Sequence, residues 1–296
     1  MNPIFILGPT GCGKSKVAVQ LAQLLGHAEI VSADAYQVYR AMPVLTAAPT
    51  PAEMAGIPHH LIGNLEVSEN NDAATHARRA MAAIADIQAR GAVPIITGGS
   101  GLYVKFISHG ISPAPPSDPA LRAELMALPT AETVRRLQEL DPEGAAATNL
   151  QNPRYVVRNL EIVILSGKPL SHWRNNWQPR ACGPGFCLMR EVPELDKRIA
   201  TRAEQMLAQG AIDEVAALPE QISATAEKTL GLALIRDYLA GKISRPDLSA
   251  ALALATRQYA KRQRTWLRRE PWATPIPCND SSATDIFSTL QSLTIS

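Results

Sequence analysis

One short segment near the N-terminus constrains the fold of this chain more than any other feature. Residues 4–7 form an apolar run that leads directly into a match to G-x-x-x-x-G-K-[ST] at every fixed position, Gly8-Pro9-Thr10-Gly11-Cys12-Gly13-Lys14-Ser15. In the order strand, glycine-rich loop, helix, the backbone N–H groups of such a loop surround a phosphate or diphosphate. Lys14 would bring a positive charge to the phosphate oxygens, and Ser15 a hydroxyl ligand for Mg²⁺. The segment predicts a polyphosphate site without saying which polyphosphate binds.

Length and composition limit the class of protein. At 296 residues the chain is long for one compact core and predicts one large domain with an insertion, or two domains. Apolar residues make up 46% of it, and a net charge of +2 does not by itself indicate a nucleic-acid partner. The four cysteines form no C-x-x-C pair, and one lies inside the phosphate loop; they are Cys12, Cys182, Cys187 and Cys278. With no signal peptide and no apolar stretch of membrane-spanning length, we expect a cytoplasmic protein.

The pattern of apolar residues predicts the fold class. Strands are expected at 4–7, 29–31 and 93–97, with helices at 14–25 and 71–90. This alternation is typical of a parallel sheet that binds nucleotides. A Pro-rich segment at 112–119 interrupts it and is followed by a helical region up to about residue 166. Further elements are expected as a returning strand at 186–189 and helices at 194–209, 229–240 and 247–268.

We therefore predict an α/β fold with a P-loop NTPase-like parallel sheet core and an inserted helical domain. The core would comprise residues 1–112 and 181–296, and the insertion residues 113–180. Ligands of open α/β sheets bind at the carboxyl ends of the strands. Two segments besides the phosphate loop follow predicted strands, Ser32-Ala33-Asp34 and Gly98-Gly99-Ser100, and all three should converge on one cleft.

The polar residues at these strand ends each allow two interpretations. Asp34 suits a general base beside a bound polyphosphate, but it would also suit a helix N-cap. Ser100 could bond a phosphate or cap a helix, and Gln37 could line a pocket or face water. The pair His59-His60 has no Cys or Glu at ligand spacing, which favours a structural role.

A basic helix is expected near the C-terminus. Arg257, Lys261, Arg264 and Arg268 share one stripe at i, i+4, i+7 and i+11, and no acidic residue interrupts the stretch before Glu270. Such a stripe, interleaved with Tyr and Trp, favours a polyanion over a merely solvated helix face.

Taken in order, these motifs resemble the bacterial tRNA dimethylallyltransferases along nearly the whole chain. The resemblance rests on the phosphate loop and on five further segments: Ser32-Ala33-Asp34 with Gln37-Val38-Tyr39-Arg40, Pro58-His59-His60-Leu61, Gly98-Gly99-Ser100-Gly101-Leu102-Tyr103, Arg158-Asn159-Leu160-Glu161 with Ser166-Gly167-Lys168-Pro169-Leu170, and Ala255-Thr256-Arg257-Gln258-Tyr259-Ala260-Lys261-Arg262-Gln263. The phosphate loop alone is shared by many families, but the ordered set is far more specific.

The resemblance implies transfer of a dimethylallyl group from its diphosphate to the N6 amine of the adenosine 3′ of the anticodon in tRNA. It implies that the phosphate loop holds the diphosphate, that Ser15 binds Mg²⁺, and that Thr10 and Asp34 are catalytic; Arg257 is our own further candidate for the diphosphate. It also implies a set of tRNA-binding residues: Asp34, Ala35, Tyr36, Gln37, Ser100, Arg122, Arg154, Arg158, Lys228, Gly231, Lys261 and Arg264. The helical insertion would grip the anticodon stem-loop, and a monomer is expected.

The chain departs from the family pattern at three positions. Ala35 replaces a usual Ser, and Ser100 replaces a usual Thr while keeping the hydroxyl. Ala233 stands where the family commonly has an Arg that helps to hold the diphosphate. Our hypothesis is that Arg236 or Arg257 supplies this charge.

Three alternatives remain open from the sequence. A relative that prenylates free adenine nucleotides shares the core motifs. A small-molecule kinase would also have a phosphate loop and an acid at the second strand end, and it would consume ATP. A non-enzymatic, nucleotide-dependent RNA-binding module would leave Asp34 without a role.

Overall fold

The computed structural model describes residues 2–179 and 183–295, so Cys182 lies outside the described residues. The chain divides into two compact units, Met1–Ile107 with Ala181–Ser296, and Ser108–Arg180. We describe each unit by itself. None of the helices in the described ranges is both long enough and apolar enough to cross a membrane.

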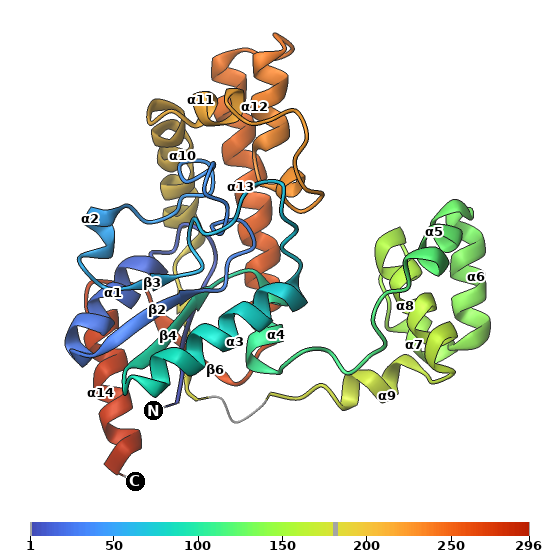
Figure 1. Ribbon diagram of the computed structural model, residues 1–296, viewed down its shortest axis with the longest axis horizontal. Helices are drawn as coiled ribbons and strands as arrows, with labels where there is room; N and C mark the ends of the chain where they lie inside the picture. The colour runs from blue at the N-terminus through green and yellow to red at the C-terminus, as the bar shows by residue number, and fades with distance from the viewer. Residues whose placement is uncertain (1, 180–182, 296) are drawn as a thin grey trace. The chain divides into compact units, whose positions relative to one another are not determined.

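The first unit is built on a parallel sheet of six strands in the order β3-β2-β4-β1-β5-β6 (Figure 1). Its strands are β1 (Ile4–Leu7), β2 (Ala28–Ser32), β3 (His59–His60), β4 (Val93–Gly98), β5 (Gly185–Met189) and β6 (Ala273–Pro277). The four strands expected from the sequence are confirmed, and they occupy the middle of the sheet, where almost all of their residues are buried. The two that sequence reasoning missed, β3 and β6, are the edges. The prolines Pro275 and Pro277 suit an edge strand, because they cannot donate ladder hydrogen bonds to a further strand.

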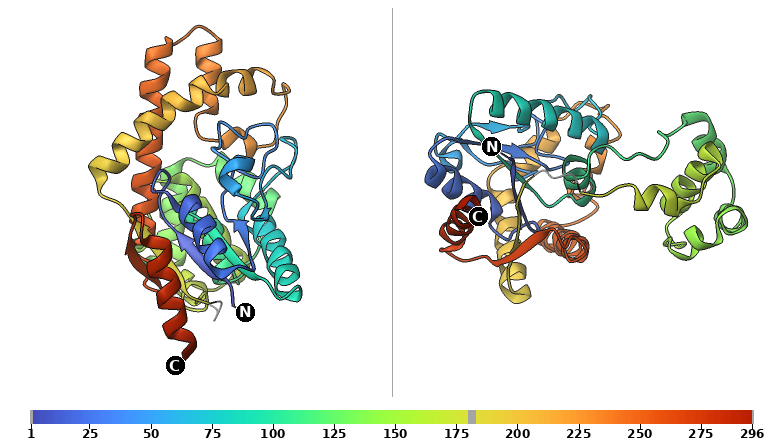
Figure 2. Two further views of the ribbon diagram at one scale, coloured as in Figure 1. Left: turned by 90° about the vertical axis from the view of Figure 1, so that its left-hand side faces the viewer. Right: turned by 90° about the horizontal axis from the view of Figure 1, so that it is seen from below.

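Helices cover both faces of this sheet. Figure 2 shows α3 (Ala73–Ala89) on one face, with α1 (Lys14–Leu25) and α14 (Ser282–Ile295) packed together on the other. The predicted helix at 14–25 is confirmed with the bounds of α1, and Asp72 caps α3 by accepting from the N–H of Thr75. Shorter elements connect the strands: α2 (Pro51–Met54) and α4 (Gly101–Ser108).

Further helices follow β5 and extend beyond the carboxyl ends of the strands (Figure 1). They are α10 (Val192–Ala208), α11 (Ala211–Ala216), the 3₁₀ turn η1 (Ala226–Lys228), α12 (Leu232–Leu239) and α13 (Arg245–Leu267). The long helices α10 and α13 pack directly against each other. Three helices were expected in this region, and α10, α12 and α13 confirm them within a few residues.

The second unit is helical, as expected for the insertion. Its helices are α5 (Pro119–Ala127), α6 (Thr130–Leu140), α7 (Pro142–Ala146), α8 (Pro153–Ser166) and α9 (Leu170–Asn175). They enclose a small separate core that includes Leu125, Leu137, Val156 and Leu160. Glu161 is fully buried here and is held by ion pairs to Arg122 at 2.5 Å and Arg158 at 2.7 Å.

Candidate active site

The phosphate loop connects β1 to α1 at the carboxyl edge of the sheet. Gly11 and Gly13 have φ angles of +80° and +108°, a conformation that other residues rarely adopt. A side chain at Gly8 would meet the sulfur of Cys12 at 2.6 Å, so this glycine is required by close packing. Lys14 Nζ donates to Pro9 O at 3.3 Å, and Ser15 is exposed at the start of α1. The loop therefore has the geometry that its sequence predicts.

A buried glutamine from α13 connects this loop to the neighbouring strand end. Gln263 is 4% exposed, and its Oε1 accepts a hydrogen bond from the backbone N–H of Thr10 at 2.8 Å. A side chain at Gly99 would meet Gly8 O at 2.4 Å and Gln263 Nε2 at 2.7 Å, so the two loops cross with no space between them. The predicted convergence of strand ends is thus confirmed for the first and third loops.

Asp34 follows β2, and buried groups fix the backbone around it. Its Oδ1 accepts from the N–H groups of Tyr36 at 2.9 Å and Gln37 at 3.4 Å and so closes a turn. Residues 35–40 form turns and no helix, so the helix N-cap interpretation is wrong. Among the described residues, Oδ2 takes part in no hydrogen bond or ion pair. His76 Nε2 donates to Ser32 O at 2.9 Å, and Asn71 Nδ2 donates to Ala35 O at 3.2 Å. One carboxylate oxygen is therefore anchored, and the other is available for a ligand.

A cavity brings the catalytic candidates together. Thr10 and Asp34 both line it, together with Tyr36 and Tyr259. Burial, and next the negative charge of Asp34, raise the pKa of Tyr259, which keeps its hydroxyl protonated. The rest of the wall is formed by the segment before α2, by α10 and α13, and by the segment before α12: Leu45, Thr46, Ala47, Ile199, Arg202, Ala203, Met206, Thr229, Leu230, Leu252 and Thr256. The cavity thus combines a polar end beside Thr10 with apolar side chains.

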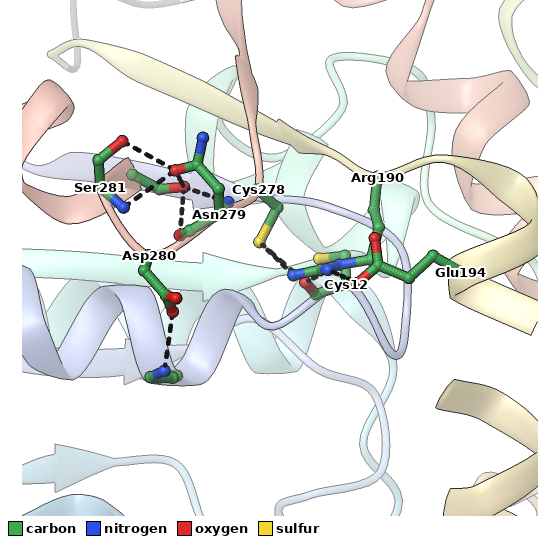
Figure 3. A network of polar contacts seen from close by, with 9 residues as sticks. Cys12, Arg190, Glu194, Cys278, Asn279, Asp280 and Ser281 are labelled. Atoms are coloured by element: carbon green, nitrogen blue, oxygen red, sulfur yellow. Dashed lines mark hydrogen bonds and ion pairs between the residues drawn. The ribbon is translucent and has the colours of Figure 1, made fainter. Parts of the chain in front are cut away.

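Arginines after β5 hold the phosphate loop from outside, and sequence reasoning missed them. Arg190 Nε donates to Cys12 O at 3.1 Å, and Arg198 Nε donates to Gly11 O at 2.9 Å. Figure 3 shows Arg190 and Cys278 converging on Cys12, where the Cys278 thiol donates to Cys12 O at 2.9 Å. Because all strands are parallel, the rule that ligands bind at their carboxyl ends could have found Arg190 and Cys278, which directly follow β5 and β6.

Several residues expected to bind tRNA have partners within the protein. Ser100 is 6% exposed; its Oγ lies 3.0 Å from Tyr259 Oη, and its carbonyl accepts the first N–H bond of α4. Gln37 Oε1 accepts from Ser32 Oγ, and its Nε2 donates to Ala47 O. Ala35 is buried. Of this group, Tyr36 lines the cavity, and contacts of all of them with RNA stay predictions.

The basic stripe of α13 forms a groove with the start of α10. Arg257, Lys261, Arg264 and Arg268 line it, opposite Val192, Leu195 and Asp196. Arg257 was expected at the diphosphate, yet it lines this groove and not the cavity that contains Thr10 and Asp34. The arrangement suits a phosphate backbone that runs past the helix.

Three further residues expected to contact tRNA lie in the helical unit. Arg122 and Arg158 pair with Glu161, and Arg154 is exposed at the first turn of α8. Burial alone would raise the pKa of Glu161, but hydrogen bonds from Arg158, Ser117 and Arg122 lower it below its ordinary value. Each of these contacts with RNA stays a prediction.

Two more expected tRNA contacts lie beside α12. Lys228 is exposed in η1. Gly231 is buried with a φ of +92°, and a side chain there would meet Leu252 at 2.6 Å. Packing alone accounts for this glycine, and its contact with tRNA stays a prediction.

The pair His59-His60 and the arginine Arg236, both singled out from the sequence, have interaction partners within the protein. His60 Nε2 pairs with Glu29 Oε2 at 2.6 Å, and His59 Nδ1 lies 2.8 Å from Ile57 O, in keeping with a structural role. Arg236, one of the two arginines proposed to replace the missing family Arg, pairs with Glu227 at 2.6 Å.

Comparisons with known proteins agree with this picture. A family model described as IPP transferase matches residues 37–270, more than half of the chain. The tRNA dimethylallyltransferase of Akkermansia muciniphila is 56% identical over 280 residues, which cover 95% of each chain. That of Halorhodospira halophila is 42% identical over 275 residues, which cover 89% of this chain and 88% of the relative.

Solved structures give the same result. The tRNA isopentenylpyrophosphate transferase of Bacillus halodurans aligns with a TM-score of 0.73 at 33% identity, over 98% of this chain and 96% of that chain. A eukaryotic dimethylallyltransferase acting on tRNA aligns with a TM-score of 0.80 at 26% identity, over 98% of this chain and 77% of that chain.

Proposed function

The chain belongs to the IPP transferase family, and from this membership we propose that it transfers a dimethylallyl group from dimethylallyl diphosphate to tRNA. The acceptor is the N6 amine of the adenosine 3′ of the anticodon, and diphosphate is released. The observation that best supports this reaction is the placement of Thr10 and Asp34 in one cavity beside the phosphate loop.

In this reaction the C1–O bond of the donor breaks, and the electron pair leaves with the diphosphate. A new bond forms between C1 and N6, and N6 then loses a proton. Asp34 Oδ2 accepts this proton, since Oδ1 is anchored to the backbone N–H groups of Tyr36 and Gln37. Thr10 lies beside the breaking bond, and its backbone is fixed by Gln263. Backbone N–H groups of the loop and Lys14 stabilise the charge that builds up on the leaving diphosphate.

The residues also fit a magnesium ion that is shared with the diphosphate. Among the described residues, no cluster of three or more His, Cys, Asp or Glu side chains could hold a metal by itself. Ser15 offers an exposed oxygen at the end of the loop, which suits Mg²⁺ because this ion takes few protein ligands and completes its shell with phosphate and water. When bound, Mg²⁺ would neutralise charge on the diphosphate.

The adenosine must leave the anticodon stack to reach Asp34, as for other enzymes that act on a base. We propose that the helical unit contacts the anticodon stem-loop through Arg122, Arg154 and Arg158, and that Lys261 and Arg264 contact the RNA backbone. The protein acts as a monomer in this proposal.

The test uses the purified protein, Mg²⁺, dimethylallyl diphosphate and an anticodon stem-loop RNA with adenosines in its loop. Mass spectrometry should detect an added C5H8 unit on the RNA. Asp34→Asn should lower the transfer rate at least about 100-fold, because a general base contributes factors of this order. Gain on adenosine monophosphate alone would assign the chain to the nucleotide-prenylating relatives. ATP consumption with no prenyl transfer would instead indicate a kinase.

A further inference from the structure

Tyr259 on α13 lines the cavity beside the proposed general base. It is partly buried and forms the wall together with Thr10, Asp34 and Tyr36. Its Oη lies 3.0 Å from Ser100 Oγ, and within the described residues this hydroxyl takes part in no other hydrogen bond. A phenol hydroxyl can donate one hydrogen bond and also accept, so one bond leaves part of its capacity unused.

The surroundings of Ser100 decide which of the two hydroxyls donates. Ser100 is 6% exposed, and in the part of the chain that the structure describes, Tyr259 Oη is the one partner of its hydroxyl. If Tyr259 donated, the Ser100 proton would be buried without an acceptor, which is costly. Ser100 therefore donates to Tyr259, and the proton of Tyr259 is left for a ligand of the cavity.

Tyr259 keeps this proton at neutral pH. Burial, and next the negative charge of Asp34, raise the pKa of Tyr259, so the phenol does not ionise next to the carboxylate. Asp34 Oδ2 can only accept, whereas Tyr259 Oη has a proton to donate. The cavity thus offers its ligand a hydrogen-bond acceptor and a hydrogen-bond donor on neighbouring side chains.

An adenine matches this pair of groups along its Watson–Crick edge. On that edge the N6 amine, which donates, lies directly beside the ring nitrogen N1, which accepts. Guanine has the opposite order, because its O6 accepts and its N1 donates, so both groups of the cavity would face the wrong partner. Enzymes that flip a base out of its stack read this edge by hydrogen bonds and hold the base against aromatic rings, such as those of Tyr36 and Tyr259.

We propose that Tyr259, oriented by Ser100, donates a hydrogen bond to N1 of the target adenine and so favours adenine over guanine. This inference rests on the proposed function and adds a base-reading residue to it. Tyr259 precedes Gln263 by one helical turn, and Gln263 holds the backbone N–H of Thr10. One face of α13 would therefore serve both substrates, the base through Tyr259 and the prenyl donor through Gln263.

The primary experiment is a double-mutant cycle between the protein and the RNA. Wild type and Tyr259→Phe are compared on anticodon stem-loops that carry adenosine, 1-deazaadenosine or 7-deazaadenosine at the target position. On adenosine and 7-deazaadenosine, Tyr259→Phe should lower kcat/KM by about threefold to tenfold, the range for one hydrogen bond. On 1-deazaadenosine the two enzymes should be equally active, because the N1 acceptor is absent. Altered reactivity of an analogue affects both enzymes and cancels in the comparison.

The matched control is Tyr238→Phe. Tyr238 is also a partly buried tyrosine of the first unit, and it lines neither the cavity nor the α13 groove. Its kcat/KM should stay within about twofold of the wild type on all three RNAs. The KM for dimethylallyl diphosphate should be unchanged in Tyr259→Phe, whereas a general disturbance of the cavity would raise it.

Ser100→Ala tests the orientation of the Tyr259 hydroxyl. It should lower kcat/KM on adenosine, but it should cause no further loss when it is added to Tyr259→Phe. Independent losses from the two substitutions would overturn the coupling between the two hydroxyls.

The possible outcomes separate this inference from the proposed function. Prenyl transfer by the wild type, with the same ratio between wild type and Tyr259→Phe on adenosine and on 1-deazaadenosine, would overturn the role of Tyr259 alone. A ratio that disappears on 7-deazaadenosine instead would overturn the bond to N1 and assign it to N7. Failure of the wild type to modify the adenosine RNA would overturn the proposed function and, with it, this inference.

Discussion

At the scale of single residues, the site is held in place mainly by groups that do not react. Gln263 fixes Thr10, and His76 with Asn71 fixes the backbone on either side of Asp34. Because these contacts are buried and specific, small changes in them should affect catalysis more than binding.

Gln263→Leu removes the acceptor for the Thr10 N–H and leaves that group unpaired beside the phosphate loop. We expect kcat to fall by roughly tenfold to 100-fold, since small displacements of a reacting group cost factors of this size. Thr265→Val on the same helix, where the hydroxyl bonds to Lys261 O, should leave kcat unchanged. Steady-state kinetics with both substrates would check this, and equal effects of the two variants would contradict it.

The buried His76 predicts how stability depends on pH. Ser32 O can only accept, so Nε2 carries the proton, and Nδ1 accepts from Asn71 Nδ2 at 3.3 Å. Burial lowers the pKa of His76, so the unfolded chain takes up a proton at a higher pH than the native one. Stability from this group is therefore complete above about pH 6.5 and is lost as the pH falls below it. Urea unfolding between pH 7.5 and 5.5 would test this, with a smaller pH dependence expected in His76→Gln.

At the scale of elements, the sequence predicted the central strands because short, mainly apolar runs alternate with helical patterns and end at glycines or polar residues. It missed β3, which has only two residues, and β6, where prolines hide the strand pattern. It also missed the role of α10. Arg198 and Arg202 are spaced at i and i+4, which places them on one face, but nothing in the sequence says that this face meets Gly11. Contacts between residues distant in the chain require the fold.

Substitution of Gly231, at the start of α12, tests whether packing against Leu252 requires a glycine there. Its φ of +92° and the close approach of Leu252 both oppose a side chain. Gly241 has a φ of +71° but no atom within 4 Å of the added Cβ, so Gly241→Ala isolates the backbone cost, about 1–2 kcal/mol. Gly231→Ala should cost about 1–3 kcal/mol more, because the packed core must also shift. Urea unfolding of both variants would measure the difference in the free energy of unfolding. Equal losses of stability would show that the Leu252 side chain moves aside at no cost.

At the scale of the whole molecule, the two units have separate hydrophobic cores, and we expect them to differ in function. In our proposal, phosphate chemistry belongs to the first unit, and RNA is contacted by both units, through Lys261 and Arg264 in the first and through Arg122, Arg154 and Arg158 in the second. The sequence indicated this division through the Pro-rich segment, which interrupts the α/β pattern, but it could not reveal the buried cluster around Glu161 that stabilises the second unit.

Glu161→Gln tests this division. It removes the partner of Arg122 and Arg158 in the helical unit and should cost about 3 kcal/mol, the lower end for a broken buried pair, because both arginines are partly exposed. Hydrogen exchange should rise within residues 108–180, and affinity for the anticodon stem-loop should fall. Pyrophosphate affinity should remain that of the wild type, and a parallel loss of both affinities would contradict independent units.

The contact between Cys278 and the phosphate loop has a consequence for how the enzyme is made. The carbonyl of Cys12 accepts from a thiol 266 residues later in the chain, and Thr10 is held by a side chain 253 residues later. The loop is synthesised 253 residues before Gln263 and its Cys12 is synthesised 266 residues before Cys278. A nascent chain that has not yet reached residue 263 therefore carries the phosphate-binding motif without these two contacts, and the site is completed only after both partners have been synthesised.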